Sequence, residues 1–103
     1  ANNDDMAIGA INALKVAGYN TGDGTTIPVF GVDATDQAKE AIAAGEMAGS
    51  ILQDSSTYGK VVAQVTNNAI SGKDLFEGLD ENIVVSDGWN VTIPYAKYLG
   101  TEN

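Results

Sequence analysis

Hydrophobic positions recur with a helical spacing near the start of the chain and then give way to a continuous apolar run. Within 4–18 they fall three or four positions apart, on one face of a predicted helix: Ala7, Ile11, Leu14 and Gly18. Asn3 or Asp4 can cap this helix, and Gly18 ends it. The run over 27–32 is typical of a strand, and it stops abruptly at Asp33.

The alternation of helix and strand continues through the middle of the chain. A second helix is expected to start at Thr35 or Asp36 and to stop at Gly45, and a short strand is expected over 47–52. The apolar residues of this second helix share one face: Ala38, Ala41 and Ile42. The order is therefore helix, strand, helix, strand.

A third helix is expected to begin at a cap formed by Asp54 and Ser55 and to end at Gly72. Five of its residues form the face that we expect to point inward: Tyr58, Val61, Val62, Val65 and Ala69. The pattern thus predicts a long amphipathic helix after the second strand.

The last thirty residues carry a β pattern. Two β-rich runs, 83–86 and 89–95, are joined by Asp87-Gly88, which is a strong signal for a hairpin. Trp89 follows this turn, and we expect it to pack across the hairpin rather than to contact a ligand. The tail is therefore predicted to be β.

Strands that alternate with helices predict an α/β fold: a partial doubly wound, mainly parallel sheet with helices on its faces, and a C-terminal β-hairpin. We expect a single α/β unit over 1–103. A helix that begins within three residues of the terminus normally follows a strand in such a fold, and that strand is absent. The sheet would be left with an uncovered edge or face, so we expect a homodimer or a complementing lobe.

Composition narrows the classes of function. Fourteen acidic residues and five lysines give a net charge of −9, and the lysines are scattered singly. Nucleic acid and anionic membrane surfaces are therefore poor partners. The chain has no cysteine and no histidine, which excludes disulfides, thiolate zinc sites and histidine-based catalysis or metal binding. No apolar run approaches the roughly 20 residues that span a bilayer, so we expect no membrane insertion of this chain.

Other motifs give no sign of an enzyme or of a bound cofactor. The segment Gly22-Asp23-Gly24 lacks the length and the lysine of a phosphate-binding loop, and no run has the spacing of a calcium loop. Nothing in the surroundings of Asp4 and Asp5 marks this carboxylate pair for acid–base catalysis. We therefore expect no catalytic residues, no metal site and no cofactor. Asp33 is the first candidate for binding a small molecule, because ligands bind at the carboxyl ends of strands in open α/β sheets.

Four separated segments carry a family resemblance, in the order ANND at 1–4 with MAIGA at 6–10, IPVFGVDA at 27–34, GEMAGSILQD at 45–54, and IPY at 93–95. In order and spacing they resemble the periplasmic glucose/galactose-binding proteins, which are type I periplasmic binding proteins. The resemblance covers essentially the whole chain but only the carboxyl-terminal third or so of that two-lobed family. It implies a ligand-edge segment of one lobe at 1–54, a helix that follows the hinge at 55–73 and a hairpin tail at 74–103.

The resemblance implies a solute receptor whose two α/β lobes close on a hexose, glucose or galactose, and deliver it to an ABC permease. It implies an extracytoplasmic location, in the periplasm or as a cell-surface lipoprotein. Asn3 is similar to the family's sugar-contacting asparagine before the helix, and Asp33 to its carboxylate at the strand end. Gln53 stands where the family has asparagine, one methylene shorter. A calcium site, where the family has one, depends on residues outside this chain.

Sugar chemistry suits these residues, because an aspartate accepts hydrogen bonds from two hydroxyls and an amide both donates and accepts. Asn3, Asp33 and Gln53 then form a polar cluster for ligand binding. The competing interpretation is that Asn3 and Asp33 are only helix or turn caps. At the level of function, the competing hypothesis is a structural module that dimerises by pairing or swapping strands and binds no sugar. A related alternative is the sugar-sensing domain of a transcription regulator, which would need a helix-turn-helix before residue 1.

Overall fold

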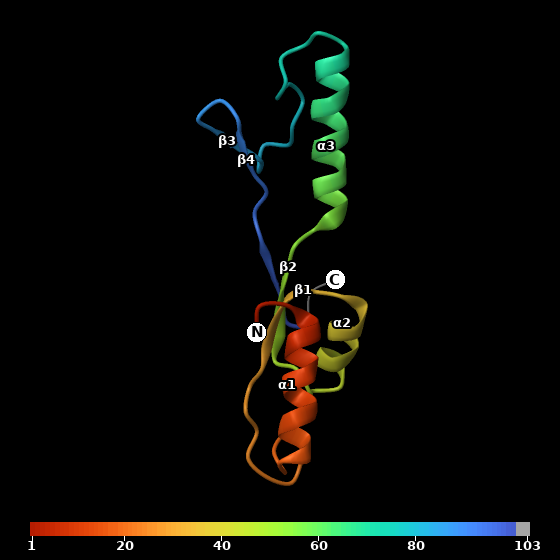
Figure 1. The fold of residues 1–103 in the computed structure, drawn as a ribbon, viewed down its shortest axis with the longest axis vertical. Coiled ribbons are helices and arrows are strands. Elements are labelled where there is room, and N and C mark those ends of the chain that lie inside the picture. Colours follow the sequence, from red (N-terminus) through yellow and green to blue (C-terminus); the bar gives the residue numbers. More distant parts are fainter. Residues whose placement is uncertain (101–103) are drawn as a thin grey trace. The chain divides into compact units, whose positions relative to one another are not determined.

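The computed structural model describes residues 1–100, within which lie three helices and five strands (Figure 1). The chain divides into two compact units. The first unit contains Ala1–Gln53 together with the segment that starts at Ala96, and the second unit is Asp54–Tyr95. The last three residues of the expected tail, 101–103, lie outside the described part of the chain.

The sheet of the first unit has the strand order β1-β2-β5. Strands β1 (Phe30–Asp33) and β2 (Gly49–Leu52) are parallel, whereas β2 and β5 (Ala96–Tyr98) are antiparallel. The α/β class predicted from the sequence is confirmed, and the sheet is mixed. Strand β5 was not predicted, because its three residues show neither an apolar run nor an alternating pattern.

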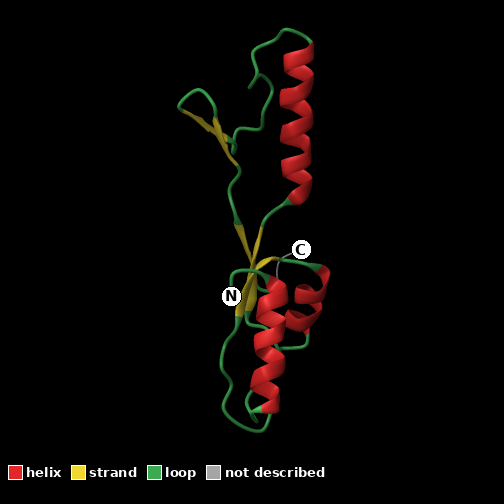
Figure 2. Cartoon of the chain, viewed as in Figure 1, coloured by secondary structure: helices red, strands yellow, loops and turns green. Residues whose placement is uncertain are grey.

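Helices α1 (Asp4–Val16) and α2 (Asp36–Ala43) pack together on one face of this sheet (Figures 1 and 2). They bury the residues that the helical spacing selected, and Met47 joins them in one core: Ala7, Ile11, Ala38, Ile42 and Met47. Strand residues alternate between faces, so Ser50 points toward the helices while Phe30 and Ile51 lie on the opposite face. These two side chains are 53% and 37% exposed.

All three helices end in the same local motif, which explains three of the glycines. Each of Gly18, Gly45 and Gly72 has a positive φ and directly follows the last helical turn. The amide of each glycine and that of the next residue donate to the last free carbonyls, as in a Schellman motif. The predicted helix stops are therefore confirmed at these glycines.

The second unit contains α3 (Ser55–Ile70) and a hairpin of β3 (Val84–Ser86) and β4 (Asn90–Thr92). Asp87 and Gly88 both have positive φ, as a type I′ turn requires, and the predicted hairpin is confirmed. Asp54 caps α3, since its carboxylate accepts hydrogen bonds from the Ser56 amide and the Thr57 hydroxyl. The bond from the Thr57 hydroxyl is the main reason that the pKa of Asp54 is lowered.

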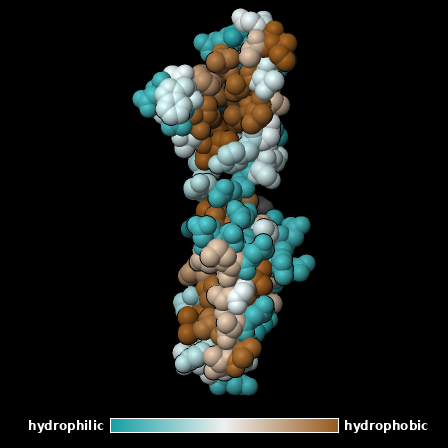
Figure 3. Space-filling view, in the orientation of Figure 1, coloured by the Kyte–Doolittle hydropathy of each residue, from teal (hydrophilic) through white to brown (hydrophobic). Residues whose placement is uncertain are grey.

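The predicted inner face of α3 is largely wrong. Val62 is 64% exposed, Tyr58 and Ala69 are also exposed, and Asn68 is the buried residue of this helix. Trp89 is 75% exposed instead of packing across the hairpin. Figure 3 shows hydrophobic side chains gathered on an exposed face of this unit. The helical period marked an apolar stripe correctly, but within residues 1–100 too few elements pack against α3 to bury it.

No helix in the described part of the chain is both long and apolar enough to cross a membrane.

Candidate functional site

The candidate site lies in the first unit, at the edge where the parallel strands β1 and β2 end. Asp33 is the last residue of β1 and is in register with Leu52, so Gln53 directly follows the neighbouring strand end. Parallel strands lie about 4.8 Å apart, which brings the backbones of Asp33 and Gln53 close together. Asn3 directly precedes α1, whose first residue bonds to the loop after β1, so Asn3 lies at the same edge. The structure therefore gathers all three predicted site residues.

Asn3 is the N-cap of α1. Its Oδ1 accepts a 2.9 Å hydrogen bond from the Met6 amide. Within residues 1–100 its side-chain NH₂ group has no protein partner, so two donors remain for a ligand. Capping and ligand binding are therefore compatible for this side chain.

Asp33 is not a helix cap. Thr35 caps α2 instead, through a 3.2 Å hydrogen bond from the Ala38 amide to its Oγ1. Asp33 is exposed, and no side chain or amide in the described part donates to its carboxylate. Within residues 1–100 the hydrogen-bonding capacity of its carboxylate is unused. Gln53 is half-buried and likewise has no hydrogen-bond partner there.

The backbone at Asp33 is unusual. Asp33 has φ of 114° and Ala34 has φ of 54°, and neither residue is glycine. Left-handed conformations of this kind cost about 1–3 kcal/mol per residue and persist only where the surrounding structure holds them. The turn that presents the Asp33 carboxylate is therefore held by other contacts.

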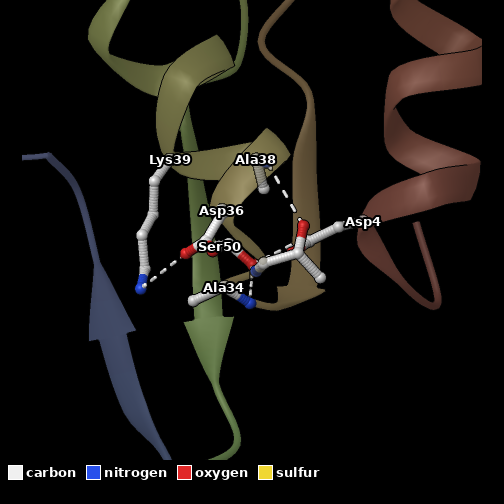
Figure 4. A network of polar contacts seen from close by, with 7 residues as sticks. Asp4, Ala34, Asp36, Ala38, Lys39 and Ser50 are labelled. Carbon is white, nitrogen blue, oxygen red and sulfur yellow. Dashed lines mark hydrogen bonds and ion pairs between the residues drawn. The ribbon is translucent and has the colours of Figure 1, made fainter.

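Those contacts come from Asp4, whose side chain is fully buried behind the edge (Figure 4). Its Oδ2 accepts a 2.8 Å hydrogen bond from the Thr35 amide, and its Oδ1 accepts a 2.6 Å bond from the Ser50 hydroxyl. The Ser50 Oγ in turn accepts a 3.1 Å bond from the Ala34 amide. One carboxylate thus joins the start of α1, the loop after β1 and strand β2.

The sequence pattern did not indicate this role, because it marked Asp4 only as a possible cap of the first helix. Two residues carry a signal in retrospect. Gly31 lies within β1, and a Cβ there would overlap the Asp4 carboxylate. Ser50 is a buried polar residue within an otherwise apolar strand. A strand glycine and a strand serine in register with each other indicate that a polar group lies over the sheet.

No cation is paired with the three candidate side chains within residues 1–100. Lys15 pairs with Glu46 at 2.6 Å, and Lys39 lies 3.7 Å from Asp36 and over the ring of Tyr98. The described residues also contain no group of three acidic side chains that could hold a metal ion. A carboxylate and two amides without a cation suit a neutral ligand with several hydroxyls better than an anion.

Comparison with known proteins shows which family the chain resembles. A sequence model of the family described as "Periplasmic binding protein domain" matches residues 1–74. The D-galactose/methyl-galactoside binding periplasmic protein MglB of Haemophilus influenzae is 45% identical over 78 residues, which are 76% of this chain and 22% of that protein. A putative rhizopine-binding protein of Rhizobium meliloti is 52% identical over 60 residues, 58% of this chain and 18% of that protein.

A xylitol-binding protein of Mycolicibacterium smegmatis is 32% identical over 75 residues, 73% of this chain and 20% of that protein. The chain therefore spans about a fifth of the length of the curated relatives that it matches. These relatives are binding proteins by name. The family match covers more than half of the chain and includes all three candidate residues, and on this evidence the chain belongs to the periplasmic binding protein domain family.

Proposed function

We propose that this chain forms one wall of the sugar site of an extracytoplasmic solute receptor that serves an ABC permease. The observation that carries the proposal is the edge formed by Asn3, Asp33 and Gln53, where hydrogen-bonding groups from three segments have no protein partner within residues 1–100. Family membership supports the same conclusion. The role is binding, not catalysis.

The chemistry of the edge fits a sugar. Adjacent hydroxyls of a pyranose can donate to the two oxygens of Asp33, and charge-assisted bonds of this kind are the strong ones. The amide of Gln53 can donate to one hydroxyl and accept from another, and the Asn3 NH₂ group can donate to a third. Because all three side chains bind hydroxyls at fixed positions, they would favour a sugar with one arrangement of hydroxyls over sugars with other arrangements.

We propose an aldohexose, glucose or galactose, as the ligand of the intact receptor. The relative named for galactose and methyl-galactoside is 45% identical over three quarters of this chain. Other relatives are named for xylitol and for ribose, so the ligand test needs these compounds as competitors. Gln53 is one methylene longer than the asparagine that the resembling family has at this place. The sugar hydroxyl nearest to Gln53 is therefore the most informative one to vary among the ligands tested.

The chain alone is expected to bind weakly. It corresponds, in this proposal, to the carboxyl-terminal portion of the receptor, with 1–54 as the ligand-edge segment, 55–73 as the helix after the hinge and 74–103 as the tail. Sites for small molecules bury most of the ligand surface. A single wall cannot do so, and we expect millimolar affinity.

The proposal is tested by titrating the ¹⁵N-labelled chain with glucose, galactose, ribose and xylitol and following amide shifts by NMR. Saturable shifts centred on Asn3, Asp33 and Gln53 are expected with the hexoses. Asp33→Ala should weaken the binding roughly tenfold or more. Asp23→Ala, which removes an exposed loop carboxylate, is the matched control and should change nothing. Absence of saturable shifts, or shifts elsewhere in the chain, would contradict the proposal.

A second candidate function is a structural module that dimerises. The observation that favours it is the sheet face opposite the helices, where Phe30 and Ile51 are exposed. Light scattering at rising concentration measures the mass directly. A dimer that Phe30→Ser dissociates, together with no sugar binding, would favour this candidate; a monomer that binds hexose would exclude it.

A further inference from the structure

The structure contains a fully buried carboxylate that the proposed sugar contacts do not use. Asp4 accepts hydrogen bonds from Thr35 and Ser50, and no lysine in the described part of the chain is paired with it. Removing a charged group from water without a cation is costly, even at a helix start where the dipole favours an anion. A side chain held at such cost is expected to do more than fill space.

Both contacts of Asp4 reach the residues directly after Asp33. The Thr35 amide donates to Asp4 itself, and the Ala34 amide donates to the Ser50 oxygen that Asp4 holds by its other carboxylate oxygen. Asp33 and Ala34 are the two consecutive residues with positive φ. Within residues 1–100 the amides of Ala34 and Thr35 have no other hydrogen-bond acceptor, so without these bonds the turn would relax toward an ordinary conformation.

The same side chain also connects the other two candidate residues. Asp4 directly follows Asn3, and Ser50 lies in β2 three positions before Gln53. One buried carboxylate therefore links the three segments that carry Asn3, Asp33 and Gln53.

We propose that Asp4 is a positioning residue: with Ser50 it holds the turn at 33–35 so that the Asp33 carboxylate faces the ligand. The inference rests on the proposed sugar-binding function for its consequence, but its structural part is independent of any ligand. A purely structural role, such as starting α2, is already filled by Thr35, whose Oγ1 accepts from Ala38. Asp4 is thus free to act on the turn itself.

The first test is made without sugar. In the labelled chain, the three-bond HN–Hα couplings of Asp33 and Ala34 report φ, and hydrogen exchange of the Ala34 and Thr35 amides reports their bonds. Asp4→Ala is expected to change both couplings and to speed exchange at these amides. Asp5→Ala, which removes the exposed acid next to it in the same helical turn, is the matched control and should change neither. Unchanged couplings in Asp4→Ala would overturn the proposal.

The second test uses sugar and a double-mutant cycle. Asp4→Ala should weaken hexose binding about three- to tenfold in the original chain and have little effect when Asp33 is already alanine, because coupled residues are not additive. Equal losses in both backgrounds would show a merely structural effect and overturn the proposal. Asp4→Asn, which keeps the shape and one acceptor, should restore part of the affinity.

Two outcomes separate this inference from the proposed function. If the original chain binds no sugar while Asp4→Ala still alters the Asp33 and Ala34 couplings, the function fails and the positioning role stands. If Asp4→Ala does not fold, Ser50→Ala replaces it, because this change removes the bond to the Ala34 amide and leaves the bond between Asp4 and Thr35. Ser50→Ala is expected to speed exchange at Ala34 more than at Thr35, and equal exchange at both would overturn the proposed route through Ser50.

Discussion

The Ser50 hydroxyl donates a 2.6 Å hydrogen bond to Oδ1 of Asp4, joining residues that are 46 positions apart in the sequence. This bond fixes the start of α1 against β2, and Gly31 on β1 leaves the space in which the carboxylate lies. The edge that carries the candidate sugar contacts therefore depends on the buried carboxylate of Asp4 and on Gly31, whose lack of a Cβ leaves room for that carboxylate.

Gly31→Ala should destabilise the first unit strongly. The new Cβ would overlap the Asp4 carboxylate and lie 3.1 Å from the Asp4 Cα, so backbone as well as side chain must move. Overpacking of this kind costs roughly 1–3 kcal/mol or more. Urea denaturation measures the loss. Gly9→Ala is the control: no atom lies within 4 Å of its new Cβ, and alanine in a helix should stabilise by about 0.5–1 kcal/mol. Equal stability of the two variants would contradict the geometry at Gly31.

Two substitutions of the strained residue Asp33 should differ in their effect on stability but not in their effect on sugar binding. Asp33→Gly should raise the free energy of unfolding by about 1 kcal/mol, since glycine adopts φ of 114° without the penalty of a side chain. Asp33→Ala keeps the strain and should leave stability nearly unchanged. Both variants lose the carboxylate, and both should bind hexose roughly tenfold or more weakly than the original chain. Thermal denaturation beside the sugar titration checks the pair, and a stability gain in Asp33→Ala matching that of Asp33→Gly would contradict the role of φ.

The local features of the fold were predictable because their signals are local. Asn3 and the glycines at 18, 45 and 72 follow from capping rules that involve neighbours a few positions away. Asp33 was predicted as a ligand residue because ligands bind at the carboxyl ends of strands, whereas Gln53 came only from the family resemblance. The role of Asp4 was missed because an acid in a first helical turn is usually solvated. Its burial depends on the bond to Ser50, and the two residues are 46 positions apart, so no short window of the sequence contains both.

The stability of α3 should depend on pH through its cap. The hydrogen bond from the Thr57 hydroxyl, together with the Thr57 and Ser56 amides, lowers the pKa of Asp54. A carboxyl with a lowered folded pKa stabilises the fold above its unfolded pKa of about 3.9, and this contribution is lost as the pH falls through the folded value. Amide exchange in α3 should therefore accelerate in that acidic range. Asp54→Asn caps without titrating, so its exchange should be less sensitive to acid; an identical pH profile would contradict the assignment.

Asn68 should be essential to the second unit although it lies far from the candidate sugar contacts in sequence. It is 1% exposed, its Nδ2 donates to the carbonyls of Leu75 and Glu77, and its Oδ1 accepts from Gln64. Asn68→Ala leaves these groups without their partner and should cost roughly 1–3 kcal/mol, because buried unsatisfied carbonyls lose both protein and water as partners.

The measurement is hydrogen exchange over 72–78 together with urea denaturation. Asn67→Ala is the matched control on the same helix, since Asn67 is exposed and alanine is the better helix former. We expect faster exchange over 72–78 in Asn68→Ala and unchanged exchange there in Asn67→Ala. Hexose binding should persist in both, because all three candidate contacts belong to the first unit. Loss of binding in Asn68→Ala at a temperature where the first unit stays folded would place part of the sugar site in the second unit.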